Sequence, residues 1–325
     1  MQSINKRKIV LDFEQPVREL EEKISEFKQL AANSSSDLSE EVQRLEERAQ
    51  NIRRAIYDHL TPSQRIQIAR HPARPTSLDY IQAISEDFFE LHGDRMGYDD
   101  LAIVGGLGRF EGQTVMFIGH QKGRDTKDNI LRNFGMPHPE GYRKAQRLMR
   151  HAAKFGIPIV SLLDTQGGYP GIQAEERGQA IAIAESLALM ATLEVPIVSI
   201  VIGEGCSGGA LGIGLGDRVL MFQHAYYAVI SPEGCAAILW KDPGMASRAA
   251  EIMKLTSDDL LALEVIDGIV PEPLGGCHVD PVRAAKNLSF ALSDHLRELL
   301  RVPAWQLVED RYAKYRKMGQ FTEVF

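Results

Sequence analysis

A glycine-rich segment is the part of the sequence whose residue types point most directly to chemistry. Seven glycines lie among the 14 residues from 203 to 216, and Gly205, Gly208 and Gly209 are three of them. Each glycine inside a helix lowers stability by roughly 1 kcal/mol, so another factor must favour them here. Where a strand leads into a helix, free backbone N–H groups with no Cβ atom beside them can reach a ligand oxygen. Amides placed in this way stabilise an enolate or another developing oxyanion.

A second segment of the same kind precedes the first. The residues IPIVS at 157–161 recur almost unchanged as VPIVS at 195–199, which is 38 residues later. Each run is followed by glycines at the same offset, and in the earlier loop, 164–171, Gly167 and Gly168 offer a second set of amides. This loop has no nucleophile of its own. Two amide sites suit a reaction in which two anions develop.

Other interpretations of the later segment stay open. Residues 205–209 also match G-x-S-x-G, the nucleophile elbow of serine hydrolases and peptidases, with Ser207 as the nucleophile. The later triad members in the hydrolase order are Asp258 or Asp267, and His278. The doubling of the loop favours backbone amides over a nucleophile. A G-x-G-x-x-G dinucleotide site is discounted, because no acidic residue ends a second strand about 20 residues on. Tight packing of a helix on a sheet, without a ligand, is the simplest alternative.

A basic stretch just before the earlier loop is a candidate anion site. Residues 120–151 contain eight Lys or Arg and three Asp or Glu, a local balance of +5, although the whole chain has a net charge of −7. The candidates for contact with a phosphorylated carrier or a carboxylate are Lys122, Arg124, Arg143 and Lys144. The alternative is a solvated helix face paired with acidic neighbours. The acidic balance of the whole chain argues against general binding of nucleic acid.

Composition sets wider limits on the class of protein. The 325 residues are 44% apolar, which is enough for a large core and excludes disorder for the bulk of the chain. No apolar run approaches the roughly 18 residues that span a bilayer, and the first residues lack the apolar segment of a signal peptide. We therefore expect a cytosolic protein.

Metal binding is not indicated by the cysteines or the histidines. Cys206, Cys235 and Cys277 are an odd number at wide spacing, which fits neither a disulfide framework nor a zinc ribbon. The histidines do not cluster with carboxylates at metal-ligand spacing. We expect reduced cysteines and no metal bound by this chain.

The N-terminal region predicts a helical hairpin. Apolar residues recur in steps of three, four and seven between Val17 and Leu30 and again between Val42 and Ile56, which gives one apolar stripe on each of two helices. Residues 33–37 are of turn type, with Asp37 or Ser39 as the N-cap of the second helix. The hairpin packs on its own protein or contacts a partner subunit.

The elements that must position the glycine loops form an α/β arrangement with parallel strands. An irregular connection at 62–76 precedes a domain boundary near residue 76, and an amphipathic helix is predicted from Ser77 through Leu91. A glycine-rich helix is predicted from about Ser207. Strands are predicted at 101–107, 114–119, 157–161, 195–199, 218–222 and 228–230, and C-terminal helices at 284–302 and 307–318.

Six motifs in order give the chain a family resemblance. It resembles the alpha subunit of the bacterial and plastid-type acetyl-CoA carboxylase carboxyltransferase, from about residue 11 to about residue 276. The motifs are GHQKGR at 119–124, RNFGMP at 132–137, PEGYRK at 139–144, AEERGQ at 174–179, SGGA at 207–210 and ISPEGC at 230–235.

The resemblance implies a crotonase-like fold, a superhelix of ββα turns preceded by the helical hairpin. The implied units are the hairpin with its connection at 1–76, the carboxyltransferase domain at 77–282 and C-terminal helices at 283–325. The implied reaction is transfer of the carboxyl group from carboxybiotin to acetyl-CoA, which gives malonyl-CoA for fatty acid biosynthesis. The location implied is the cytoplasm, or the stroma in a plastid lineage.

The resemblance also implies partners. These are a beta subunit that bears a zinc ribbon, in an α2β2 assembly, the biotin carboxyl carrier protein that holds biotin covalently, and the biotin carboxylase that uses ATP. The active site would lie between the alpha and beta chains, with carboxybiotin on the alpha side.

Site residues carried over from the family are backbone groups. The amides of Gly208 and Gly209 would form the oxyanion hole, and the loops that contain Gly205, Cys206, Ser207, Gly167 and Gly168 would receive carboxybiotin. The chain departs from the family sequence Asp-Thr-Pro-Gly-Ala-Tyr at Gln166 and Gly168, and Cys206 replaces a glycine. These departures leave open a scaffold protein that has lost the chemistry.

Overall fold

The computed structural model describes residues 9–33 and 39–319. In these residues eight strands form one sheet, and its order is β1-β2-β3-β4-β5-β6-β8, with β7 paired to the end of β5. β1 to β3 are antiparallel, and the pairs from β3 to β8 are parallel. The strands are β1 (Glu86–Glu90), β2 (Ile103–Phe110), β3 (Gln113–His120), β4 (Ile159–Thr165), β5 (Ile197–Cys206), β6 (Arg218–Phe222), β7 (Tyr226–Ala228) and β8 (Gly268–Val270).

The repeat seen in the sequence becomes the centre of the sheet. β4 and β5 are adjacent, and Ile159 pairs with Ile197, so the 38-residue period is the register between them. Every residue of both strands is buried, as expected for β-branched runs covered on both faces. The strand predicted at 218–222 is found with the same bounds, and the one predicted at 228–230 lies two residues earlier, as β7.

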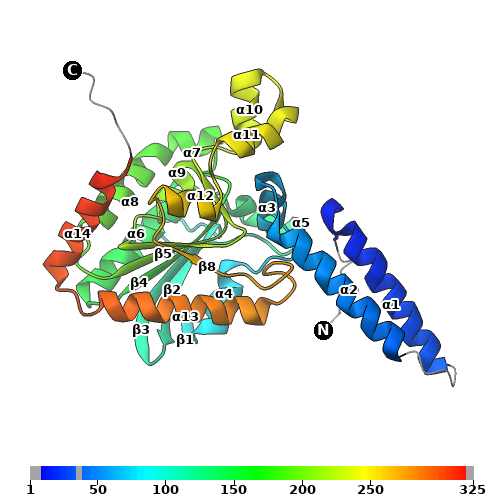
Figure 1. Ribbon diagram of the computed structural model, residues 1–325. Helices are drawn as coiled ribbons and strands as arrows, with labels where there is room; N and C mark the ends of the chain where they lie inside the picture. Colours follow the sequence, from blue (N-terminus) through cyan, green and yellow to red (C-terminus); the bar gives the residue numbers. More distant parts are fainter. Residues whose placement is uncertain (1–8, 34–38, 320–325) are drawn as a thin grey trace, which may run out of the picture.

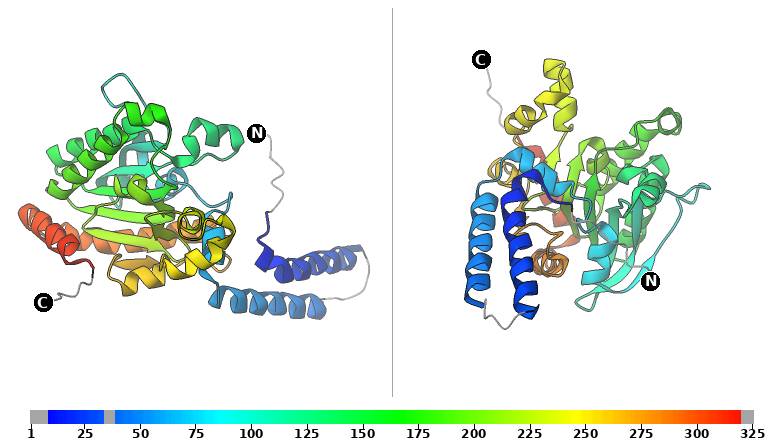
Figure 2. Two further views of the ribbon diagram at one scale, coloured as in Figure 1. Left: turned by 90° about the horizontal axis from the view of Figure 1, so that it is seen from above. Right: turned by 90° about the vertical axis from the view of Figure 1, so that its right-hand side faces the viewer.

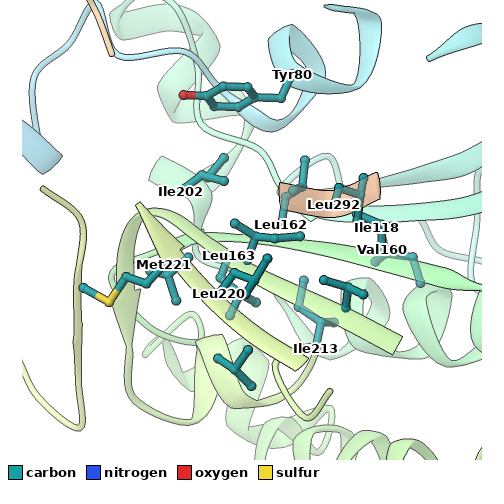
Figure 3. Close-up of a cluster of buried hydrophobic side chains, with 14 of the residues drawn as sticks. Tyr80, Ile118, Val160, Leu162, Leu163, Ile202, Ile213, Leu220, Met221 and Leu292 are labelled. Atoms are coloured by element: carbon teal, nitrogen blue, oxygen red, sulfur yellow. The ribbon is translucent and has the colours of Figure 1, made fainter. Parts of the chain in front are cut away.

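Helices cover both faces of the sheet (Figures 1 and 2). α4 and α13 lie on one face and α6 on the other, since Gly108 faces Ser85 after α4 whereas Gly105 faces Leu148 of α6. Figure 3 shows Tyr80 of α4 and Leu292 of α13 beside strand residues such as Leu162. The helices of the body are α4 (Ser77–Ile84), α5 (Thr126–Leu131), α6 (Pro139–Lys154), α7 (Ile172–Glu176), α8 (Gln179–Thr192), α9 (Ser207–Leu211), α10 (Pro232–Trp240), α11 (Ala246–Ile252), α12 (Ser257–Ala262), α13 (Pro281–Leu299) and α14 (Ala304–Lys317), with 3-10 turns η2 (Asn133–Gly135) and η3 (Pro243–Met245).

The predicted helical hairpin is confirmed. α1 (Gln15–Asn33) and α2 (Ser39–Asp58) pack on each other and project from the sheet, after the 3-10 turn η1 (Asp12–Glu14) (Figures 1 and 2). Tyr57 anchors the base, because its hydroxyl lies 2.7 Å from Glu14 Oε1 and 3.0 Å from the carbonyl of Gly275. The predicted turn lies mostly outside the described residues, and α2 begins at Ser39.

Two predictions between the hairpin and β2 were wrong. Residues 62–76 are not wholly irregular, because α3 (Pro62–Ala69) begins there with Thr61 as N-cap and a capping box to Gln64. The helix predicted through Leu91 ends at Ile84, and the chain continues as β1 with an irregular register next to Asp87, whose φ is +52°. Pairing with β2 overrides the helical spacing of the apolar residues.

Parts of all three predicted units pack in one buried cluster, although Tyr57 and Leu60 at the base of the hairpin belong to a second, smaller one. Ile66 of α3 and Leu288 of α13 belong to the same buried cluster as strand residues of the middle unit. No helix of the described residues is both long enough and apolar enough to cross a membrane.

Candidate functional site

The two glycine loops touch because the strands before them are parallel neighbours. Thr165 at the end of β4 pairs with Gly205 near the end of β5. A Cβ atom placed on Gly209 would lie 2.2 Å from the carbonyl carbon of Gly167, so only a glycine permits this approach. The sequence indicated two similar loops, and the structure brings them into direct contact.

A cavity of about 520 Å³ opens over this contact, within the size range of small-molecule sites. Ser207 lines it, and a Cβ atom on the next residue, Gly208, would meet nothing closer than the Ile183 side chain, at 3.7 Å. The residues that line the cavity include Arg70, Gln166, Gly167, Gly168, Ser207 and Val229.

The turn after β5 is tighter than the sequence predicts. α9 has five residues and ends at Leu211, so the predicted glycine-rich helix does not continue through the later glycines. A helix this short has a small dipole, and the individual amides are what it offers a ligand. Ser207 has a φ of +57°, a left-handed conformation that is rare for a residue with a side chain. Cys206 is extended, with a φ of −115°, so it needs no glycine.

A buried ion-pair network underlies both loops. The ammonium of Lys122 lies 2.7 Å from Asp164 Oδ1 and 2.7 Å from Glu204 Oε1, and these carboxylates stand at the ends of β4 and β5. Burial lowers the pKa of Lys122, but the two carboxylates outweigh it and raise that pKa above its ordinary value. Burial likewise raises the pKa of Glu204, yet the charges of Lys122 and Arg70 outweigh it and hold the pKa at about 2. Lys122 and Glu204 are therefore both charged at neutral pH.

Arg70 completes the network and reaches the cavity wall. Its Nε lies 2.8 Å from Glu204, its Nη1 lies 2.7 Å from Glu233, and its Nη2 donates to the hydroxyl of Tyr226 at 3.0 Å. Arg70 also lines a second cavity of about 350 Å³, together with Lys122 and Gln166. Arg70 thus joins the floor of the two loops to the segment that begins α10.

Comparison with known proteins identifies the family. The model of the family described as acetyl co-enzyme A carboxylase carboxyltransferase-like matches residues 10–319. The chain belongs to this family. The protein named acetyl-coenzyme A carboxylase carboxyl transferase subunit alpha from Synechococcus elongatus is 56% identical over 320 residues, which are 98% of each chain. The protein of the same name from Nostoc punctiforme is 55% identical over 324 residues, covering 100% of this chain and 99% of the relative.

Solved structures with low sequence identity share the fold. A subunit of a Pseudomonas malonate decarboxylase hetero-tetramer in complex with coenzyme A has a TM-score of 0.58 at 15% identity, covering 74% of this chain and 97% of that one. A transcarboxylase 12S chain has a TM-score of 0.55 at 21% identity, and this chain spans 42% of its length. The crotonase-like α/β fold is confirmed.

The four basic candidates of this carboxyltransferase-family chain all face carboxylates. Lys122 and Arg124 line the second cavity, and Arg124 also pairs with Asp79 at 2.5 Å. Arg143 pairs with Asp94 at 3.1 Å and lines neither cavity. The remaining candidate is buried away from both cavities, because Lys144 binds Asp99 at 2.6 Å and the carbonyl of Asp100 at 2.7 Å.

The catalytic triad that a serine hydrolase would need is not assembled around Ser207 in this structure. The His278 ring stacks on His71, with ring centroids 3.8 Å apart. Asp258 pairs with Arg65 at 2.7 Å, and Asp267 pairs with Lys314. The two possible acids and the base are therefore engaged away from Ser207. Ser207 resembles a nucleophile elbow in its G-x-S-x-G pattern, its place between β5 and α9 and its positive φ.

The departures from the family sequence fit the geometry of this carboxyltransferase-family chain. The side chain of Gln166 reaches into the cavity wall, where its Nε2 is 3.5 Å from Glu204 Oε1. A Cβ atom on Gly168 would lie 2.5 Å from Nε2 of Gln179, so glycine gives that side chain room. Cys206 is fully buried, with its sulfur 3.6 Å from the Tyr226 hydroxyl.

Sequence reasoning missed Arg70, which stands 134 residues from its partner Glu204. It carries no local pattern, since it follows α3 in a stretch that reads as an irregular connection. The described residues hold no group of three His, Cys, Asp or Glu placed to bind a metal ion.

Proposed function

We propose that this chain provides the carboxybiotin side of a carboxyltransferase that forms malonyl-CoA from acetyl-CoA. The observation that carries the proposal is the meeting of two glycine loops beside an open cavity, in a chain of this family. Amides at such a junction stabilise a developing oxyanion without a catalytic side chain. The close contact of Gly209 with Gly167 fits this role, because it fixes the backbone that presents them.

The substrates supply the bond changes. As the N–CO₂ bond of carboxybiotin breaks, the ureido oxygen gains the charge, the biotin anion takes a methyl proton of acetyl-CoA, and the methyl carbon joins CO₂. In this proposal the N–H groups of Gly208 and Gly209 donate to the ureido oxygen, and the loops with Gly205, Cys206, Ser207, Gly167 and Gly168 form the walls. Each donor is worth about 3–4 kcal/mol by analogy with other oxyanion holes.

A partner chain is part of the proposal. Apolar side chains stand exposed around the loops: Ile172 is 79% exposed, Val229 is 80% exposed and Ile181 is 65% exposed. Such a rim is typical of an interface. We propose that a beta subunit covers it, in an α2β2 assembly in the cytoplasm, and holds the acetyl-CoA. The covalently held biotin would arrive on a carrier protein and would be recharged by a separate ATP-dependent biotin carboxylase.

The basic residues enter the proposal in two ways. Lys122 and Arg124 line a cavity and stay candidates for contact with an anionic substrate group. Arg143 and Lys144 would have a structural role. Their ion pairs with Asp94 and Asp99 connect the first turns of α6 to the loop that contains these carboxylates.

The test is carboxyl transfer between malonyl-CoA and a free biotin derivative, with and without a beta subunit. Transfer should require both chains. Gly208→Val should lower turnover at least 100-fold, because the branched side chain covers the amides, while the thermal unfolding temperature changes little. Gly208→Ala is the matched control, since its methyl group has room beside Ile183. Unchanged turnover in Gly208→Val would exclude these amides, and no transfer by the paired wild-type chains would exclude the function.

A further inference from the structure

The carbonyl group of Gly209 is held from inside the protein by two side chains. His120 Nε2 lies 3.1 Å from this oxygen, and the hydroxyl of Tyr142 also lies 3.1 Å from it. Both side chains are completely buried. His120 ends β3 and Tyr142 lies in the first turn of α6, so two elements outside the glycine loops converge on one peptide group.

This carbonyl is available because α9 stops early. In a regular α-helix the N–H of Ile213 would donate to Gly209, but here it donates to the carbonyl of Ala210 at 3.3 Å. A buried carbonyl without a donor is costly, and the two side chains replace the backbone donor. They bind the oxygen from one side while Gly167 packs against the other side of Gly209.

The protonation state of the histidine follows from its partner. A carbonyl oxygen only accepts, so Nε2 carries the proton. Burial lowers the pKa of His120 to about 3, which keeps the ring neutral near pH 7. His120 and Tyr142 are thus two neutral donors that share one acceptor.

Gly209 needs such restraint more than any residue with a side chain. Glycine rotates freely about its backbone bonds. The N–H and the restrained carbonyl of Gly209 are joined through one α carbon, so holding the carbonyl limits the movement of the N–H. An oxyanion site gains its effect from donors that are fixed before the reaction. We propose that His120 and Tyr142 are positioning residues that fix the Gly208–Gly209 amide pair. This inference rests on the function proposed above.

Tyr142→Phe is the sharpest test, since it removes one hydroxyl and keeps the ring that packs on Gly212. With the paired chains, kcat for carboxyl transfer should fall about 3- to 10-fold, the effect of one hydrogen bond, while KM for the biotin derivative stays constant. Backbone hydrogen exchange in the segment 207–212 should become faster, whether or not the beta subunit is present. Tyr80→Phe is the matched control, because Tyr80 is also buried but lies in the hydrophobic core (Figure 3), where its ring stacks on Phe222.

Two variants of His120 separate donation from packing. His120→Gln keeps an N–H donor near the position of Nε2. It should therefore retain most of the turnover, and backbone hydrogen exchange in 207–212 should stay as slow as in the wild type. His120→Leu keeps bulk without a donor, so it should resemble Tyr142→Phe. Equal kcat and equal exchange in wild type, Tyr142→Phe and His120→Leu would overturn the inference. Equal loss in Tyr80→Phe would also overturn it, by showing a general effect of core hydroxyls.

The exchange measurement keeps this inference separate from the proposed function. If the paired wild-type chains transfer no carboxyl group, the function fails, and exchange in 207–212 still decides whether the two side chains restrain Gly209. If the wild type is active but the variants match it in both measurements, the function stands and the positioning role fails.

Discussion

The loops after β4 and β5 follow strands of nearly the same sequence, yet they use their amides differently. In the first loop the N–H of Gly167 donates to Thr165 Oγ1 at 3.1 Å, and the N–H of Tyr169 donates to the carbonyl of Pro137 at 2.9 Å. In the second loop Gly208 and Gly209 stand in the first turn of a helix, where N–H groups have no partner within the helix.

Within the proposed function, this difference gives the two loops unequal roles. The sequence suggests two equivalent amide sites. The geometry instead favours a first loop that holds the second in place, and a second loop whose free amides are available to a ligand. Contact between Gly167 and Gly209 links the two roles.

Lys122→Met should disrupt the ion-pair network that joins the ends of β4 and β5. Without the ammonium, the carboxylates of Asp164 and Glu204 stay buried with less compensation, which lowers the free energy of unfolding by about 3–5 kcal/mol. Urea denaturation measures this loss. Lys127→Met, on the exposed side of α5, is the control and should change stability by less than about 0.5 kcal/mol. Similar stability of the two variants would show that the network does not hold the loops.

Gly209→Ala should disrupt the contact between the loops. The added methyl group would overlap the peptide of Gly167, so stability should fall by about 1–3 kcal/mol and turnover should fall at least tenfold. Gly208→Ala, one residue earlier, should have a much smaller effect on both. Thermal unfolding and carboxyl transfer check the pair, and a reversed order would contradict the assignment of Gly209 to the contact.

Stability should decrease in acid because of Glu204. Its pKa is held at about 2, below the ordinary 4.5, so its contribution is complete above pH 4.5 and is lost as the pH falls toward 2. The loss should be on the order of 3 kcal/mol. Glu204→Gln should be less stable near pH 7 and should converge with the wild type toward pH 2. Parallel curves for the two proteins would contradict the assignment.

Thr165→Val should weaken only the supporting loop. Thr165 is fully buried, and its hydroxyl both donates to the carbonyl of Gly167 at 2.7 Å and accepts from its N–H. Loss of these bonds should lower stability by about 1–3 kcal/mol. Thr192→Val, at the exposed end of α8, is the control in urea denaturation. A drop in turnover larger than that of Gly209→Ala would mean that the first loop does more than support.

Gly168→Ala should have the smallest effect. The new methyl group would meet the end of the Gln179 side chain, which is flexible and can move at the expense of its 2.8 Å bond to Pro137. Turnover should change less than about threefold, since one neutral hydrogen bond is at stake. A loss as large as that of Gly208→Val would show that the first loop also presents amides.

The parts of the fold that the sequence predicts are those decided by local pattern. The strand at 218–222 and the two strands that contain Ile159 and Ile197 are predicted from β-branched runs. The helical spacing of Phe88 predicts a helix there, but the segment pairs with β2 as a strand instead. α3 was missed because prolines mark the segment as irregular, although a proline in the first turn is compatible with a helix.

The candidate site likewise has parts that a local sequence pattern reveals and parts that depend on distant contacts. Glycines at a strand end are visible as a motif, so the sequence proposes Gly208 and Gly209 as site residues. Arg70, His120 and Tyr142 act through partners 134, 89 and 67 residues away, and no local pattern announces such contacts. The sequence therefore points to the glycines of the loop and gives no signal for the side chains that bond to its backbone and its carboxylate.

The contact between Gly167 and Gly209 sets a rule for protein engineering. Two loops that meet through backbone atoms alone must begin at the same register position of their paired strands. A one-residue insertion in either strand would therefore separate the loops, unless the other strand also received one. A chimera that takes the later loop from a relative should also take the earlier loop, together with the ends of β3 and α6. The unit that can be exchanged is the interlocked pair, not the motif.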